Sequence, residues 1–223
     1  MTEPFVHVKG AIERALAEKW VQGVYEGRAA WVSDFRAAQH SLGRAWYTHL
    51  EQDRSREYFE QAKESDAIVE RFCPGLQETM RILAGRAVGA NVVRRHGWCG
   101  AGVHVFPAKG LCATRGGDIH FDDEGLPPAH KKERAPAFTL VLMLQPATTG
   151  GGLKVWDVVY RGSEAYEDED LERPSALAEY AVGDLVVMDS YRLHQIQPFD
   201  GDVDRISATI HLAYVAGEWE SWF

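Results

Sequence analysis

The sequence predicts a mostly β fold with a helical flank, in which a β-sandwich or jelly roll packs on N-terminal helices. From about residue 91 onward, short β-rich runs alternate with clusters of Gly, Pro and Asp, as in antiparallel sheets. Before that point the chain is rich in Ala, Glu and Leu at helical spacing. One hydrophobic core stops growing at roughly 250 to 300 residues. We therefore expect one domain over residues 1–223, with a helical layer in 1–90 and a β core in 91–223.

Four helices are expected in the N-terminal layer. Residues 11–20 are rich in Ala, Glu and Leu, and residues 29–50 repeat apolar side chains at close to helical period. A third helix is expected over residues 52–72. Pro74-Gly75 then marks its end, and a shorter fourth helix is expected to follow and to run through Arg86. This layer is expected to cover one face of the sheet.

Six strands are expected in the β core, at residues 103–106, 118–121, 138–144, 153–159, 184–188 and 207–215. Residues 138–144 are nearly all apolar, which is typical of a strand covered on both faces. A proline-punctuated loop over residues 125–136 and an acidic insertion over 163–174 interrupt the core. The acidic insertion is expected to be a solvated loop, with a cover over a pocket as the alternative.

Composition limits the classes of partner. The chain is 45% hydrophobic and 26% charged, as in globular proteins, and its formal net charge is −9. A negative surface disfavours binding to nucleic acid phosphates and to anionic membranes. We therefore expect a small-molecule substrate and no nucleic acid or membrane partner, while the oligomeric state is not predicted.

The cysteines and the N-terminal residues indicate a reducing environment. Cys73, Cys99 and Cys112 are odd in number and match no thiolate zinc spacing. The first residues lack the basic and apolar regions of a signal peptide, and no run of about 18 apolar residues occurs. We expect reduced thiols and a cytoplasmic protein.

Three residues predict a metal site. His120 and Asp122 lie two positions apart in Gly-Gly-Asp-Ile-His-Phe-Asp, a spacing that puts both side chains on one face of a strand. His194 follows far downstream, at the end of Gly-Asp-Leu-Val-Val-Met-Asp-Ser-Tyr-Arg-Leu-His. Two imidazoles and one carboxylate make the facial triad of non-haem Fe(II) oxygenases, which leaves metal positions open for chemistry.

The order of motifs between residues 91 and 215 resembles that of the Fe(II)/2-oxoglutarate-dependent dioxygenases. The His-x-Asp pair is followed by a Gly-rich turn at Gly150, by the strand that runs into His194, and by Arg205-x-Ser207. The resemblance implies a double-stranded β-helix that binds Fe(II) through the triad. It also implies 2-oxoglutarate and O2 as co-substrates, with release of succinate and CO2.

Arg205 and Ser207 are the residues that the resemblance assigns to 2-oxoglutarate. A guanidinium is always charged and donates two parallel hydrogen bonds to a carboxylate, and a hydroxyl two positions along the strand faces the same way. The alternative for Arg205 is a surface salt bridge with Asp202 or Asp204.

The reaction expected from the resemblance is hydroxylation, or another oxidation, of an unactivated C–H bond in a small molecule such as an amino acid or a natural-product intermediate. Asp122 favours hydroxylation, because halogenases of this family typically have a small residue at that position. Arg115 lies on the approach to His120 and is a candidate for holding a substrate carboxylate or phosphate. Trp98 is a candidate for an apolar wall of the site.

Three alternatives remain open at the level of sequence. The first is a peptidyl, prolyl-type hydroxylase that acts on protein. The second is a cupin-like metal-binding protein that does not use 2-oxoglutarate, although cupins usually place more histidines around a glutamate. The third is a β-sandwich interaction protein without catalytic activity.

Overall fold

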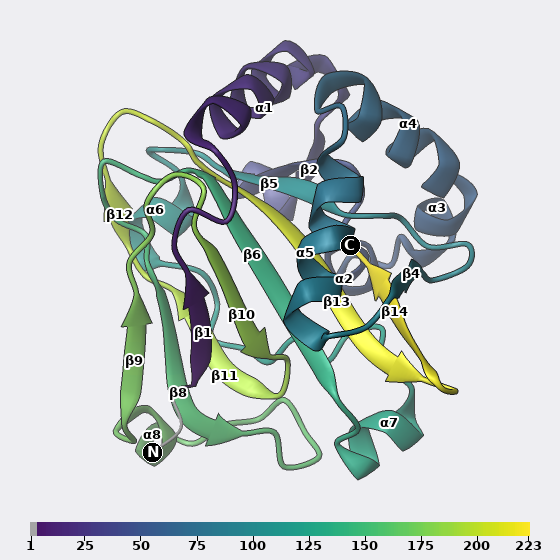
Figure 1. Cartoon of the computed structure of the whole chain (residues 1–223). Coiled ribbons are helices and arrows are strands. Elements are labelled where there is room, and N and C mark those ends of the chain that lie inside the picture. The colour runs from purple at the N-terminus through teal and green to yellow at the C-terminus, as the bar shows by residue number, and fades with distance from the viewer. Residues whose placement is uncertain (1–3) are drawn as a thin grey trace.

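The computed structural model describes residues 4–223, and within them a nine-stranded, mostly antiparallel sheet dominates the fold (Figure 1). Its main path runs β1-β10-β6-β13-β5-β3-β2, and β14 and then β4 extend it beside β13. The strands of this major sheet are β1 (Phe5–Val8), β2 (Val32–Asp34), β3 (Gln39–Leu42), β4 (Val92–Arg94), β5 (Gly102–Phe106), β6 (Ala137–Gln145), β10 (Leu185–Asp189), β13 (Arg205–Val215) and β14 (Glu218–Trp222).

A minor sheet has the order β11-β8-β9, and a two-stranded ribbon pairs β12 with β7. These strands are β7 (Thr149–Gly150), β8 (Leu153–Val159), β9 (Ser175–Ala178), β11 (Arg192–Ile196) and β12 (Phe199–Asp200). Leu153 and Val155 of β8 pack with Val186 and Met188 of β10. The minor sheet therefore lies against one face of the major sheet, which we call the inner face.

Helices cover the opposite, outer face of the major sheet (Figure 1). Trp20 of α1 and Met80 of α5 join Leu140, Leu142 and Ile210 in the largest apolar cluster. The helices are α1 (Arg14–Glu26), α2 (Trp46–Glu51), α3 (Ser55–Glu60), α4 (Ala62–Phe72), α5 (Leu76–Val88), α6 (Leu111–Arg115), α7 (Pro128–Glu133) and α8 (Asp168–Leu171).

The central strand β13 shows why the two faces differ. Side chains alternate between faces along a strand. Ile206, Ala208, Ile210 and Leu212 belong to the outer cluster, whereas the intervening residues Arg205, Ser207, Thr209 and His211 are polar and line a cavity on the inner face. The alternation is what brings polar groups into the space between the sheets.

The prediction of a mostly β protein with helices is confirmed. Strands occur where they were expected around residues 103–106, 138–144, 153–159, 184–188 and 207–215. The strand expected at 118–121 is reduced to one isolated bridge between His120 and His194. The first predicted helix, at residues 11–20, lies instead at Arg14–Glu26, and the helix expected over 52–72 is interrupted at Gln61.

The helix predicted over residues 29–50 is wrong up to Trp46, where α2 begins. Phe35, Arg36 and Ala37 have positive φ angles, which an α-helix excludes, and β2 and β3 flank them. β3 pairs with β5, so sheet hydrogen bonds override a helical repeat of apolar residues. Three strands from the N-terminal segment thus complete the major sheet.

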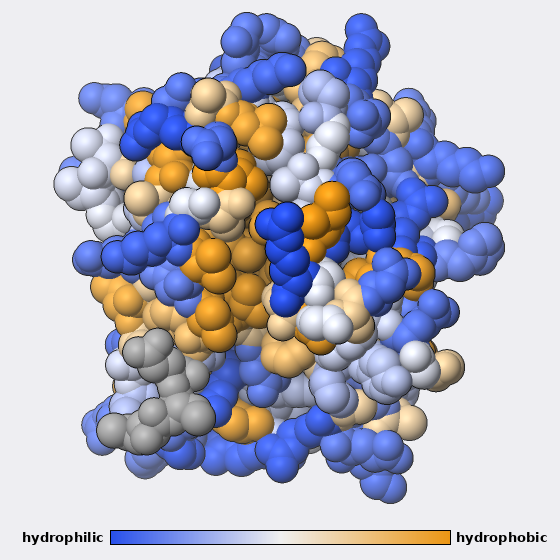
Figure 2. Space-filling model, viewed as in Figure 1, coloured by the Kyte–Doolittle hydropathy of each residue, from blue (hydrophilic) through white to orange (hydrophobic). Residues whose placement is uncertain are grey.

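The surface is mainly hydrophilic. Figure 2 shows one apolar region over β1 and its neighbours, where Val6 and Val8 are exposed. Cys73, Cys99 and Cys112 are free and buried. None of the helices in residues 4–223 has the length and apolar character that crossing a membrane requires.

Candidate metal centre

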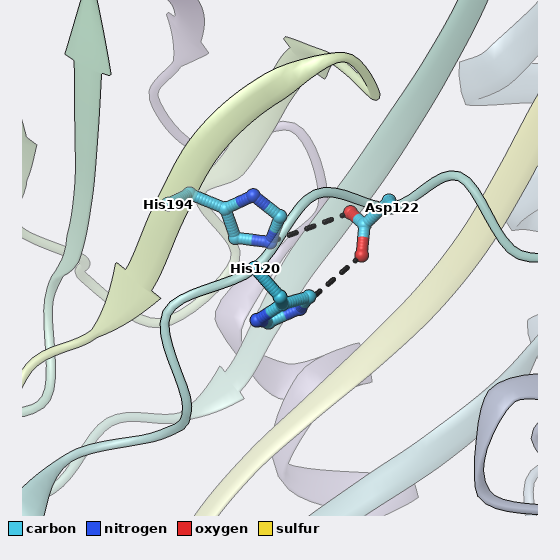
Figure 3. Close-up of side chains that lie close together, drawn as sticks. All are labelled: His120, Asp122 and His194. Atoms are coloured by element: carbon cyan, nitrogen blue, oxygen red, sulfur yellow. Dashed lines mark ion pairs between the residues drawn. The ribbon is translucent and has the colours of Figure 1, made fainter. Parts of the chain in front are cut away.

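His120, Asp122 and His194 meet at one edge of the space between the sheets (Figure 3). His120 Nε2 lies 3.4 Å from one carboxylate oxygen of Asp122, and His194 Nε2 lies 3.5 Å from the other. One ligand atom from each residue lies within 4.8 Å of the other two, which suits a shared metal ion. Two imidazole nitrogens and a carboxylate are the donor set of a facial Fe(II) triad.

Backbone pairing holds the three ligands in place. His120 and His194 exchange two backbone hydrogen bonds, of 3.1 Å and 3.0 Å, between the segment after α6 and strand β11. The backbone N–H of Asp122 donates to the carbonyl of Ser190 over 2.9 Å. Residues distant in the sequence are thereby fixed side by side.

Both imidazoles are oriented with Nε2 toward the centre. His120 Nδ1 lies 2.8 Å from the carbonyl oxygen of Asp118, and His194 Nδ1 lies 2.9 Å from that of Arg192. A carbonyl accepts only, so each Nδ1 carries a proton, and Nε2 is the nitrogen that can bind a metal once it is deprotonated.

The charge of Asp122 and the burial of the two imidazoles set the electrostatics of the triad. Burial lowers the pKa of His194 to about 4. Burial also lowers the pKa of His120, but the hydrogen bond and charge of Asp122 outweigh it and raise this pKa to about 9. Although burial opposes it, the charges of His194 and His120 keep the pKa of Asp122 well below its usual range. The carboxylate is therefore ionised and ready to bind a cation.

A cavity of about 440 Å³ opens beside the triad. The major sheet contributes Arg205, Ser207, Thr209 and His211 to its wall, and the minor sheet contributes His194. The predicted co-substrate residues and the predicted metal ligands thus line the same cavity.

Arg205 is a buried cation without an anion. Its side chain is 1% exposed, Nε donates to the carbonyl of Gly151 over 2.9 Å, and Nη1 donates to Ser207 Oγ over 3.3 Å. Among the described residues, Nη2 has no hydrogen-bond partner and no carboxylate pairs with the guanidinium. The alternative of a salt bridge to Asp202 or Asp204 is wrong, because Asp202 pairs with Lys109 and Asp204 accepts from Tyr25 and Ala108.

The Gly-rich turn before β8 fixes the position of Arg205. Gly151 has a φ of +71°, and a Cβ atom at this position would lie 3.3 Å from Cδ of Arg205. Glycine therefore permits both the turn and the close approach of its carbonyl to the guanidinium.

Two further histidines line the cavity. His211 Nδ1 lies 3.1 Å from the hydroxyl of Thr139, and its ring stacks on Trp222. His104 is 5% exposed, and its Nδ1 has no hydrogen-bond partner among the described residues. Burial, together with the charges of His211 and Arg205, lowers the pKa of His104 to about 3, so this imidazole is neutral.

Besides Asp122, four carboxylates border the same cavity, namely those of Glu51, Asp118, Glu124 and Glu164. Within residues 4–223 none of them takes part in an ion pair, and Arg205 is the sole Arg or Lys of the lining. Burial raises the pKa of Glu124 to about 8, and a cation bound beside it would favour the ionised form.

A second cavity, of about 480 Å³, adjoins the first, since Glu124 and Glu164 line both. Trp98 lies in the wall of this second cavity and not in that of the cavity beside the triad. Arg115, at the end of α6, lines neither, although its neighbours Cys112 and Gly116 reach the first cavity. Asp123, the neighbour of Asp122, is 1% exposed and pairs with Lys131.

Sequence reasoning missed the part of the cavity wall that comes from the N-terminal segment. Phe35, Gln39, Tyr47 and Glu51 reach the cavity because β2 and β3 join the major sheet. No local sequence pattern predicts this pairing of β2 and β3 with the rest of the sheet. Glu124 had a signal, because it continues the i, i+2 spacing of His120 and Asp122.

No protein-family model matches the chain, and no curated protein matches it. Solved structures do. SnoN, a non-haem alpha-ketoglutarate-dependent epimerase from nogalamycin biosynthesis, superposes with a TM-score of 0.56 at 17% identity, over 94% of this chain and 77% of SnoN.

Two further structures show the same likeness. An N-substituted L-amino acid dioxygenase from Burkholderia ambifaria has a TM-score of 0.57 at 15% identity, over 95% of this chain and 84% of that enzyme. A prolyl hydroxylase from Trichoplax adhaerens has a TM-score of 0.54 at 13% identity, over 93% and 82% of the two chains. At these identities the likeness shows the fold, and this chain has the fold of the Fe(II)/2-oxoglutarate-dependent oxygenases.

Proposed function

We propose that this protein is an Fe(II)- and 2-oxoglutarate-dependent dioxygenase with a double-stranded β-helix core. One observation carries the proposal: the His120, Asp122 and His194 group shares a cavity with Arg205, a buried cation whose Nη2 lacks a partner. A metal triad alone fits several kinds of protein. A triad beside an unpaired buried guanidinium fits a metal that works with a carboxylate-bearing co-substrate.

The residues fit both groups. His120, Asp122 and His194 would hold Fe(II), and Arg205 with Ser207 would hold the distal carboxylate of 2-oxoglutarate. When bound, Fe(II), 2-oxoglutarate and O2 supply the oxidising chemistry, with release of succinate and CO2. An unpaired buried charge is costly, so the vacant Nη2 of Arg205 favours an anionic ligand as part of the working protein.

The residues of this chain orient the metal ligands and shield the co-substrate anchor from water. The carbonyls of Asp118 and Arg192 hold the protons of the two imidazoles on Nδ1, which keeps each Nε2 available to the metal. Ser207 accepts from Arg205 and so orients the guanidinium toward the cavity. The sheets around Arg205 keep water away from it, which strengthens its hold on an anion.

The reaction that we propose is hydroxylation of a C–H bond in a small molecule, such as an amino acid or a natural-product intermediate. Asp122 would occupy the metal position that a small residue leaves to a halide in the halogenases of the family that this site resembles. The cavity of about 440 Å³ lies in the size range of small-molecule sites. The same ligand set serves desaturation and ring formation, so product analysis must identify the oxidation.

The decisive experiment is anaerobic addition of Fe(II) and 2-oxoglutarate to the metal-free protein. We expect the weak visible charge-transfer band of an iron-chelated 2-oxo acid. Asp122→Ala should abolish the band by removing a ligand, while Asp202→Asn, on the exposed loop before β13, should leave it unchanged. Folded wild-type protein that gives no band would overturn the proposal.

The substrate class is tested separately. Succinate formation should be stimulated by a free amino acid or amine of the right shape and not by peptides that contain proline. Stimulation by the peptides alone would replace the small-molecule substrate with a peptidyl one, and would leave the cofactor assignment intact.

A further inference from the structure

The cavity beside the triad and the second cavity adjoin each other. Glu124 and Glu164 line both, so their side chains stand at the junction. Glu124 is half-buried and follows the metal ligand Asp122, whereas Glu164 is exposed and belongs to the acidic insertion before α8. A ligand that extended from the triad into the second cavity would pass these two side chains.

Among the described residues, the ionisable side chains around the second cavity that lack an ion-pair partner are acidic. Arg95 and Lys131 line the second cavity, but Arg95 pairs with Glu220 over 2.8 Å and Lys131 pairs with Asp123 over 2.7 Å. In the part of the chain that the structure describes, neither Glu124 nor Glu164 has an ion-pair partner. The basic side chains are paired with their own partners, and the two junction carboxyl groups are not paired.

The far end of the second cavity is apolar and aromatic. Trp46 and Trp98 lie with ring centroids 4.9 Å apart at an interplanar angle of 55°, and Leu50, Leu126 and Val215 complete the wall. Aromatic faces attract both apolar groups and cations. This end of the cavity therefore suits an apolar or aromatic group attached to a positively charged one.

Independent of these carboxylates, a buried polar group indicates that a ligand belongs in the space. His104 is 5% exposed, lines the cavity beside the triad, and leaves Nδ1 without a partner among the described residues. Buried polar atoms are satisfied in the great majority of cases. A ligand in the cavity would supply the missing hydrogen bond.

We propose that the two cavities form one binding site for an elongated organic cation, with its ammonium or guanidinium group held between Glu124 and Glu164. Its apolar or aromatic end lies in the Trp46–Trp98 cavity, and the C–H bond to be oxidised lies at the triad. The oxidation rests on the proposed dioxygenase function, but binding of the cation does not. This assignment also replaces an acidic substrate held by Arg115, which lines neither cavity.

The test is calorimetric titration with three probes of equal size and different charge: 2-phenylethylamine, 2-phenylethanol and phenylacetate. The amine is a cation at neutral pH and spans the junction and the aromatic end. We expect it to bind about tenfold more tightly than the alcohol and to leave phenylacetate weakest, because a half-buried charge-assisted hydrogen bond contributes about 1.5 kcal/mol or more. Equal or tighter binding of phenylacetate, or no binding of any probe, would overturn the proposal.

Glu→Gln variants test which carboxyl groups hold the amine. Glu124→Gln should weaken the amine about tenfold and Glu164→Gln, which is exposed, about two- to fivefold. Glu169→Gln is the matched control, because it removes the same charge from an exposed residue of the same insertion outside both cavities. Affinity for 2-phenylethanol should be unchanged in all three, which shows that the site is still folded. If neither Glu124→Gln nor Glu164→Gln differs from Glu169→Gln, the cation site does not exist.

The same titrations with and without anaerobic Fe(II) and 2-oxoglutarate separate this inference from the proposed function. A charge-transfer band without preferential binding of the amine would leave a dioxygenase whose substrate is not a cation. Preferential binding of the amine without a band would leave a cation-binding protein that is not a dioxygenase.

Discussion

The two faces of strand β13 are both buried, but one carries apolar side chains and the other carries polar ones. On the outer face Ile206, Ile210 and Leu212 are at most 2% exposed and pack against the helical layer. On the inner face Arg205 is equally buried, but its Nη2 has no hydrogen-bond partner within residues 4–223. The outer face is fully packed, whereas the inner face is buried with a hydrogen-bond donor that has no partner in the described structure.

The contrast separates stability from function. A buried donor without a partner costs about 1 to 3 kcal/mol, and a buried charge costs more. An apolar side chain in a packed cluster stabilises the fold instead. Substitutions on the inner face should therefore change ligand binding with little loss of stability, and substitutions on the outer face should do the reverse.

The largest effect is expected for Arg205→Met. Affinity for 2-oxoglutarate should fall by about 4 kcal/mol, near a thousandfold, since the variant removes a buried charged partner of the co-substrate carboxylate. Fe(II) affinity should be nearly unchanged, because Arg205 is not a metal ligand. Calorimetric titration of each ligand under anaerobic conditions measures both quantities.

The free energy of unfolding of Arg205→Met gives a second test of this prediction. The free energy of unfolding of ligand-free Arg205→Met should lie within about 1 kcal/mol of wild type or above it, because the variant removes an unpaired buried charge. Arg173→Met, at an exposed arginine, is the control for loss of a positive charge. Equal losses of iron and 2-oxoglutarate affinity would mean that Arg205 supports the metal site and does not bind the co-substrate.

On the outer face, Ile210→Ala should destabilise the protein by about 3 kcal/mol. Ile210 is 2% exposed in the largest apolar cluster, and truncating such a residue leaves a cavity that the surrounding helices fill only in part. Urea unfolding measures the loss. In the fraction that remains folded, 2-oxoglutarate affinity should match wild type, and a large drop would show that the two faces are coupled.

The sequence predicted the parts of the fold that have local signals. The alternation of polar and apolar residues along β13 and the i, i+2 spacing of His120 and Asp122 are properties of a strand that need no partner to be recognised. The placement of β2 and β3 depends on pairing with β5, so the helical repeat at residues 29–50 misled the prediction.

The candidate site divides in the same way. His120, Asp122, His194, Arg205 and Ser207 were predicted from motif order, and the structure brings all five to one cavity. The wall that faces a substrate was not predicted, because Tyr47, Glu51 and Glu164 come from segments that meet only after folding. Trp98 and Arg115 lie close to the expected region in sequence, but neither lines the cavity beside the triad.

Asp184 is the satisfied counterpart of Arg205, and it gives the smallest predicted effect. Its carboxylate, 4% exposed at the start of β10, accepts hydrogen bonds of 2.9 Å from His7 Nε2, 2.9 Å from the N–H of Gly10 and 3.0 Å from that of Ala181. Although burial opposes it, these donors lower the pKa of Asp184. Asp184→Asn puts an amide N–H₂ against groups that donate, and should cost about 1 to 2 kcal/mol at pH 7.

The pH dependence of the stability lost in Asp184→Asn shows whether the hydrogen-bonded charge of Asp184, and not its burial alone, stabilises the protein. A carboxylate whose folded pKa is depressed contributes stability above its unfolded pKa of about 3.9, and the contribution is lost as pH falls through the folded value. The difference in unfolding free energy between wild type and Asp184→Asn should therefore be constant above about pH 5 and shrink below pH 4. Asp202→Asn, at a loop residue whose side chain is 89% exposed, should differ from wild type by less than about 0.5 kcal/mol throughout. A difference for Asp184→Asn that persists undiminished into acid would mean that packing at the start of β10, and not the charge of Asp184, stabilises this edge of the sheet.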